Sequence, residues 1–131
     1  MERILPWADT ESLVASGFTR AFQGAMGLGN VQAAMIADSK TEALAARALV
    51  LETAGRKDAG DNVVMESAAA KYYASEMVGR VADRAVQIYG GAGYIADYGI
   101  ERLYRDVRLF RIYEGTSQIQ QIIIARELLK N

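Results

Sequence analysis

The chain has 131 residues, of which 51% are hydrophobic, and its 15 basic and 16 acidic side chains give a formal net charge of −1. This length suits one domain with one core, and the low net charge excludes a highly basic binder of nucleic acid or of anionic membranes. Cysteine and histidine are absent, which excludes disulfides, thiolate nucleophiles, Ser-His-Asp triads and nearly all zinc sites, so that acid–base chemistry has to come from Glu, Asp, Lys or Tyr.

The N-terminal segment, residues 1–14, mixes charged and apolar residues around Pro6 and lacks the basic start and apolar centre of a signal peptide. No apolar run in the sequence approaches the ~20 residues that a membrane-spanning helix needs. We therefore expect a soluble, cytoplasmic protein with no membrane span and no nucleic acid partner.

Beyond Pro6 the composition favours helix throughout. A first helical stretch is predicted over 9–16, whereas the glycines within 17–30 argue against a stable helix there. A long helix is then expected from Asn30, as its N-cap, to a C-terminal stop at Gly55. Its apolar positions are Val31, Met35, Leu44, Leu49 and Leu51.

A second long helix is predicted over 62–89, with Asp61 or Asn62 as its cap and paired glycines at 90 and 91 as its end. At 1.5 Å per residue it extends roughly 42 Å. A helix of that length needs packing partners along all of it.

Shorter elements are predicted in the remainder of the chain. A loop at 92–98 leads to a helix at 100–107, and a break at 113–117 precedes a last helix over 117–130. The expected architecture is an all-α antiparallel helical bundle with short connections. The last helix has apolar residues at Ile119, Ile122, Ile123 and Leu129.

The segment Gly90-Gly91-Ala92-Gly93 would let a backbone approach a phosphate or a ring closely. It follows a predicted helix and has Ala96 where a dinucleotide-binding fingerprint needs glycine. A helix C-cap and turn is therefore the favoured interpretation, with ligand contact as the alternative.

Arginine recurs at every third position from residue 102, which could align four guanidinium groups toward a phosphate-bearing ligand. Four arginines against three carboxylates in residues 101–114 leave a net charge of only +1. A solvated or ion-paired face is the favoured interpretation. The four residues are Arg102, Arg105, Arg108 and Arg111.

The segment Tyr113-Glu114-Gly115-Thr116-Ser117 places a carboxylate beside a glycine at a predicted loop tip. Thr116 or Ser117 can cap the following helix, whose free amide groups favour an anion nearby. From these residues alone, Glu114 is interpreted as complementing the helix dipole, with a chemical role as the alternative.

The stretches Gln-Ile-Tyr-Gly-Gly-Ala-Gly-Tyr at 87–94, Glu-Arg-Leu-Tyr-Arg-Asp at 101–106 and Ile-Tyr-Glu-Gly-Thr-Ser-Gln-Ile-Gln at 112–120 occur in this order. Together they resemble the C-terminal helical domain of acyl-CoA dehydrogenases, and the likeness continues through Ile-Ala-Arg-Glu-Leu-Leu at 124–129. We expect this domain over 18–131, with its first helix missing or altered, after an atypical segment at 1–17.

The resemblance implies that Glu114 is the base that removes the α-proton of an acyl-CoA thioester while a β-hydride moves to flavin N5. The backbone amide of Glu114 would help to polarise the thioester carbonyl. Tyr113 and Gly115 would border the acyl chain and thioester, and Arg126 would lie behind the loop as a supporting charge.

The resemblance also implies FAD as the cofactor, in a site shared between subunits and incomplete in one chain. Gln87, Gly90 and Gly91 would contact the FAD of a neighbouring subunit. Thr116 and Gln118 would contact FAD near its adenosine and pyrophosphate portion.

One family segment, Arg-x-x-Phe-Gly, usually supplies an arginine to the flavin phosphate and is degraded here. Phe22 is retained, but Thr19 stands where the arginine belongs, Arg20 is one place off and Gln23 replaces the glycine. This departure weakens the expectation of cross-subunit phosphate binding.

Two hypotheses follow. In the first, the chain is the C-terminal domain of an acyl-CoA dehydrogenase of fatty acid metabolism, which acts on an acyl-CoA only with the missing domains or with a separate subunit that carries them. Electron-transferring flavoprotein is then the expected partner. In the second, it is a non-catalytic oligomerisation or binding module derived from that family. Both predict a homo-oligomer, either a dimer or a tetramer.

Overall fold

The computed structural model describes residues 29–130, where all regular elements are helical, so the all-α prediction is confirmed. The predictions for 1–17, for the helix at 9–16 and for the segment at 19–23 lie outside the described residues. The elements are α2 (Asn30–Asp58), α3 (Val64–Tyr89), α4 (Gly91–Tyr94), the 3-10 helix η1 (Ala96–Tyr98), α5 (Ile100–Val107), the 3-10 helix η2 (Arg108–Arg111) and α6 (Ser117–Leu128).

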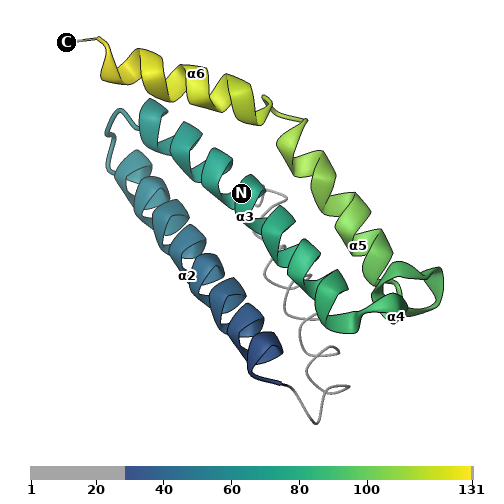
Figure 1. The fold of residues 1–131 in the computed structure, drawn as a ribbon. Helices are drawn as coiled ribbons and strands as arrows, with labels where there is room; N and C mark the ends of the chain where they lie inside the picture. The colour runs from purple at the N-terminus through teal and green to yellow at the C-terminus, as the bar shows by residue number, and fades with distance from the viewer. Residues whose placement is uncertain (1–28, 131) are drawn as a thin grey trace.

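Helix α3 is the central element of this arrangement (Figure 1). Helix α2 forms an antiparallel hairpin with it, α5 returns beside its second half, and α6 packs over its first half. Because α5 and α6 both pack on α3, the segment between them also lies beside α3, which can hold it from one side.

Within residues 29–130, no helix is both long enough and apolar enough to cross a membrane.

Helix α2 differs from the prediction at both ends. It begins at Asn30 with Gly29 as its N-cap, so Asn30 is the first helical residue and not the cap. It also continues past the predicted stop at Gly55 to Asp58. Gly60, with φ of +94°, ends the helix instead, because its left-handed backbone lets the chain turn back toward α3.

Helix α3 begins later than predicted. Its N-cap residue is Val63, and neither Asp61 nor Asn62 fills that position. The Asn62 Oδ1 still accepts a hydrogen bond from the Val64 amide at 3.4 Å. The predicted end is confirmed, since Gly90 with φ of +59° is the C-cap.

The region after α3 is more regular than predicted. The expected loop at 92–98 contains α4 and η1. Gly93 is buried in α4. A Cβ at this position would lie only 2.7 Å from the carbonyl oxygen of Val86, so the close packing requires glycine here. Helix α5 has the predicted bounds, whereas α6 ends at Leu128, before the predicted Lys130.

A small apolar core joins α2 to α3. Ala46 of α2 packs with Met77 and Val81 of α3, and all three are less than 8% exposed. Several residues predicted as apolar positions are instead exposed in this chain, so sequence periodicity overestimated the width of the buried faces. These residues are Val31, Leu44, Leu51, Ile119, Ile122 and Leu129.

Glu42 links α2 to α3 by binding two arginines of α3. Its carboxylate oxygens lie 2.8 Å from Arg84 Nη2 and 3.1 Å from Arg80 Nε. The hydrogen bond from Arg84 is the main reason that the pKa of Glu42 falls below its ordinary value of 4.5. A carboxylate with a lowered folded-state pKa stabilises the fold above its unfolded pKa, and this stability is lost as the pH falls through the folded pKa.

We therefore expect Glu42→Gln to reduce the loss of unfolding free energy that occurs when the pH is lowered from about 5 to about 3. The reduction should be no more than about 1 kcal/mol, because the ion pairs are partly exposed. Urea denaturation at several pH values measures this. Glu52→Gln, at an exposed site on the same helix, is the control. Identical pH dependence in the two variants would show that the Glu42 contacts add no acid sensitivity.

Candidate active site

Glu114 lies in the loop between η2 and α6, and its φ is +53°. Within residues 29–130 it is the only non-glycine residue with a positive φ. Such a left-handed backbone costs a non-glycine residue about 1–2 kcal/mol. Residues in this conformation persist only where their surroundings hold them, and they concentrate at functional sites. Gly115 follows with φ of +87°, so two successive residues turn the chain into α6.

The functional groups of Glu114 are open to a ligand. Its side chain is exposed, and no hydrogen bond or ion pair within residues 29–130 engages its carboxylate. Its backbone amide has no hydrogen-bond partner in the same range. The loop thus presents an acceptor and a donor from a single residue.

Lys71 of α3 binds the loop on both sides of Glu114. Its Nζ donates to the carbonyl oxygen of Phe110 at 2.8 Å and to that of Gly115 at 2.7 Å. Burial lowers the pKa of Lys71 below its ordinary 10.5, while the carboxylates of Glu76 and Glu114 act in the opposite direction. One ammonium group therefore joins η2, which precedes the loop, to the residue that follows Glu114.

Glu76, one and a half turns further along α3, binds two flanking residues. Its Oε1 accepts a hydrogen bond from Ser117 Oγ at 2.6 Å, and its Oε2 lies 3.2 Å from Arg111 Nε. The Arg111 guanidinium lies over Gly79, where a Cβ would be 2.0 Å from its Nη2. A glycine at this position of α3 therefore makes room for the ion pair.

The start of α6 completes the support of the loop. Thr116, one of the two residues predicted for this role, is the N-cap, and its Oγ1 accepts a hydrogen bond from the Ile119 amide at 3.4 Å. The Gln120 Nε2 donates to the carbonyl oxygens of Glu114 and Gly115, at 3.2 Å and 3.4 Å. The loop carbonyls are thus bound from two helices.

The three residues predicted to border the substrate differ in their distance from Glu114. Tyr113 and Gly115 are its half-buried neighbours in the loop, and burial raises the pKa of Tyr113 above its ordinary 10.0, with Glu114 acting in the same direction. Arg126 is exposed in the last turn of α6, ten residues or ~15 Å along the helix from Thr116. Its supporting role remains a prediction.

The residues predicted to contact FAD fall into two groups. Thr116 and Gln118 lie at the start of α6, beside the part of α3 that carries Lys71. The second group is Gln87, Gly90 and Gly91, at the far end of α3. Because Gln87 is sixteen residues beyond Lys71, the two groups are separated by ~24 Å along the helix. One chain does not bring them together.

The second group leaves room for a ligand to approach the backbone. Gly90 and Gly91 are exposed, and nothing lies within 4 Å of the position that a Cβ would take at either residue. The exposed Gln87 side chain has no hydrogen-bond partner within residues 29–130. These features fit contact with a flat, polar cofactor.

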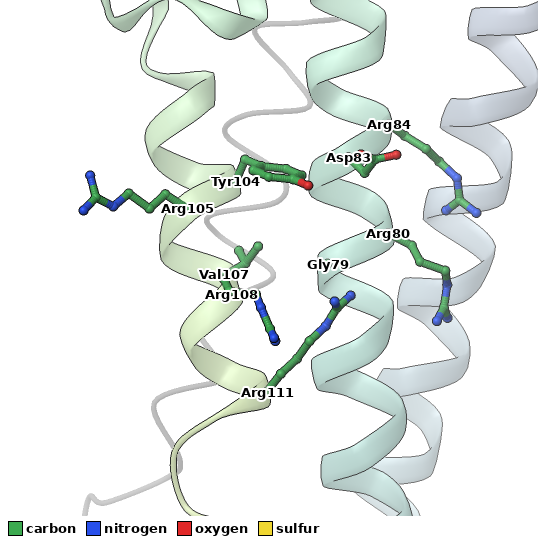
Figure 2. Close-up of a pocket in the computed structure, with 9 residues that line it drawn as sticks. All are labelled: Gly79, Arg80, Asp83, Arg84, Tyr104, Arg105, Val107, Arg108 and Arg111. Atoms are coloured by element: carbon green, nitrogen blue, oxygen red, sulfur yellow. The ribbon is translucent and has the colours of Figure 1, made fainter. Parts of the chain in front are cut away.

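The four regularly spaced arginines do not form one ligand-binding face. Arg102 lies 3.6 Å from Asp106 on the exposed side of α5, and Arg111 pairs with Glu76. Arg105 points away from α3 in Figure 2. The interpretation as solvated or ion-paired side chains is confirmed for these residues.

A groove of about 700 Å³ lies between α3 and α5. Figure 2 shows Arg108 and Arg111 converging in it. Arg80 and Arg84 also border it but point toward α2, where Glu42 binds them. Glu114 does not line this groove, so the groove is separate from the loop.

No sequence motif assigned a role to Lys71, Glu76 or Gln120, the residues that hold the loop. The position of Lys71 is a signal that could have identified it, because Ala68 and Ala70, just before it on the same helix, are buried. A lysine beside a stripe of small buried residues needs a polar partner for its ammonium group.

The all-helical fold and the held glutamate loop before α6 are compatible with the family that the sequence resembles. Residues 10–129 match the family profile described as "Acyl-CoA dehydrogenase, C-terminal domain". The chain therefore belongs to the acyl-CoA dehydrogenase family and corresponds to its C-terminal domain. The match begins at residue 10, upstream of Phe18, where the sequence resemblance was expected to start.

Two curated relatives and one solved structure illustrate the match. The caffeyl-CoA reductase–Etf complex subunit CarC of Acetobacterium woodii is 51% identical over 96 residues, which are 73% of this chain and 25% of that protein. An acyl-CoA dehydrogenase of Bacillus subtilis is 48% identical over 94 residues, with shares of 72% and 25%. The structure of butyryl-CoA dehydrogenase from Megasphaera elsdenii superposes with a TM-score of 0.84 at 31% identity and covers 95% of this chain and 35% of that one. The chain thus spans about a quarter of the length of these curated relatives.

Proposed function

We propose that this chain supplies the C-terminal domain of an FAD-dependent acyl-CoA dehydrogenase, in which Glu114 is the base that removes the α-proton of an acyl-CoA thioester. The observation that carries the proposal is the left-handed backbone of Glu114, in a loop whose carbonyl groups are bound from α3 and α6. Its carboxylate and its amide are left for a ligand.

The proposed chemistry uses both groups of Glu114. The ionised carboxylate takes the proton from the carbon next to the thioester carbonyl. The Glu114 amide donates a hydrogen bond to the carbonyl oxygen, which stabilises the negative charge that develops there as the proton leaves. Tyr113 and Gly115 border the thioester and the acyl chain, and Arg126 supplies a supporting charge.

Bound FAD would supply the acceptor for the hydride that leaves the β-carbon. Thr116 and Gln118 of one chain, together with Gln87, Gly90 and Gly91 of a second copy, would hold the cofactor. The separation of these groups along α3 supports a shared site. An electron-transferring flavoprotein as the electron acceptor is part of the proposal, and it is supported by the relative named as a subunit of an Etf complex.

The proposal requires self-association, as a dimer or a tetramer. Ile119 and Ile122 of α6 are 47% and 45% exposed, and Leu44 and Leu51 of α2 are also open. Exposed apolar residues of this kind favour an interface. We expect sedimentation to show a dimer or tetramer, and a stable monomer at high concentration would contradict the shared site. The same surface favours the second hypothesis, a non-catalytic oligomerisation module, which predicts assembly without chemistry.

A graft tests the chemistry, because the chain is expected not to be competent alone. Residues 30–129 would replace the matching segment of the Bacillus subtilis acyl-CoA dehydrogenase, with the unaltered enzyme as the control. We expect the graft to bind FAD and its flavin absorbance to bleach when an acyl-CoA is added without oxygen. A folded graft that binds FAD but remains oxidised would contradict the proposed function.

A further inference from the structure

Lys71 differs from the other cations of α3 in what it binds. Arg80 and Arg84 pair with the carboxylate of Glu42, whereas the Lys71 ammonium donates to two backbone carbonyl groups. These carbonyls belong to residues on the two sides of Glu114. These two hydrogen bonds form what we call the Lys71 bridge. From this bridge we propose that Lys71 is a positioning residue, which holds Glu114 in its left-handed conformation and orients its carboxylate and its amide. The inference rests on the proposed function of Glu114.

The bridge acts where the backbone is least favourable. Glu114 has a positive φ without the freedom of glycine, so an unconstrained loop would return it to an ordinary conformation. The carbonyl oxygens of Phe110 and Gly115 are both fixed by one Nζ, at 2.8 Å and 2.7 Å. With its two ends held together, the intervening chain has to turn sharply at Glu114.

A charged donor suits this task better than the second donor that reaches the loop. The Gln120 amide contacts the carbonyls of Glu114 and Gly115 at the longer distances of 3.2 Å and 3.4 Å. Hydrogen bonds from an ionised group are shorter and stronger than those between neutral groups. Lys71 is also half-buried on a long helix, so its stem moves little, and the charges of Glu76 and Glu114 raise the pKa of its ammonium group against the effect of burial.

Amide hydrogen exchange on the 131-residue chain tests the bridge directly. Lys71→Met keeps the length of the stem and removes the donors, Lys71→Arg keeps a charged donor, and Lys40→Met at an exposed site of α2 is the matched control. The reporters are the amides of Ile112, Tyr113 and Gln120, which are hydrogen-bonded in and around the loop. We expect Lys71→Met to speed their exchange by about 10-fold or more through local opening, with α2 unchanged.

Lys71→Arg and Lys40→Met should leave the exchange of these amides close to that of the wild type. If Lys71→Met unfolds the chain, then Lys71→Arg and Lys71→Gln provide the comparison, because Gln shortens the donor and removes its charge without emptying the site. Unchanged loop exchange in Lys71→Met, or in Lys71→Gln where that variant is used, would overturn the proposal.

A second measurement separates positioning from simple support of the fold. In the grafted enzyme, Lys71→Met should lower kcat by about 10- to 100-fold with little change in KM, because a misplaced base slows the chemical step. Lys71→Arg should recover much of this loss. A looser loop with unchanged kcat would overturn the positioning role. If the grafted enzyme with Lys71 shows no turnover at all, the proposed function fails, whereas the exchange result still decides whether Lys71 holds the loop.

Discussion

Replacing Glu114 by glutamine is expected to lower the turnover of the grafted enzyme by about 10²- to 10⁴-fold, the usual contribution of a general base. Glutamine has nearly the same shape and keeps the backbone amide, but its neutral side chain does not accept the α-proton. FAD binding and assembly should remain, because the residues proposed to hold the cofactor are unaltered. Anaerobic flavin reduction by an acyl-CoA measures the effect.

The control for this variant is Glu101→Gln, which removes a carboxylate from the first turn of α5. It should reduce flavin at the rate of the unaltered graft. Equal rates in Glu114→Gln and Glu101→Gln would contradict the role of Glu114 and favour the second hypothesis, in which the chain assembles but has no chemistry of its own.

The largest effect on stability is expected at Met77. Its side chain is 7% exposed and packs with Ala46 and Val81 where α2 meets α3. Met77→Ala removes buried apolar atoms and leaves a cavity between two long helices that share few large side chains. We expect the free energy of unfolding, measured by urea denaturation, to fall by about 2–5 kcal/mol.

Leu51→Ala is the matched comparison, because Leu51 was also predicted as an apolar position of α2 but is 53% exposed. At a dilution at which the chain is monomeric, it should change the free energy of unfolding by no more than about 0.5 kcal/mol. A loss as large as that of Met77→Ala under these conditions would contradict the exposed position of Leu51 in the single chain.

The elements that sequence predicted best are those with strong local signals. Gly90 ends α3 because glycine adopts the positive φ needed there, and Thr116 caps α6 because its hydroxyl reaches a free amide. The predicted C-terminal end of α2 was wrong because Gly55 is tolerated inside a packed helix, whereas the chain reverses only at Gly60. Local propensity does not distinguish two nearby glycines when tertiary packing decides between them.

The candidate site, too, was predicted from the sequence only in part. The neighbouring residues placed Glu114 at a loop tip but favoured a helix-dipole role, and only the family resemblance pointed to it as the proposed base. The contacts that hold it come from far along the chain, since Lys71 is 39 and 44 residues from Phe110 and Gly115. Sequence periodicity carries no information on such pairs, and the left-handed backbone of Glu114 follows from them.

The most direct test of Glu114 as the base follows the α-proton itself. In D₂O, the grafted enzyme with bound FAD would be mixed with an excess of an acyl-CoA, and NMR would record deuterium at the α-carbon of the acyl-CoA that is not oxidised. Exchange of this proton for deuterium that is fast with Glu114 and at least about 10²-fold slower in Glu114→Gln is the predicted result. Equally fast exchange in both proteins would show that another group removes the proton, and would contradict the account given for this loop.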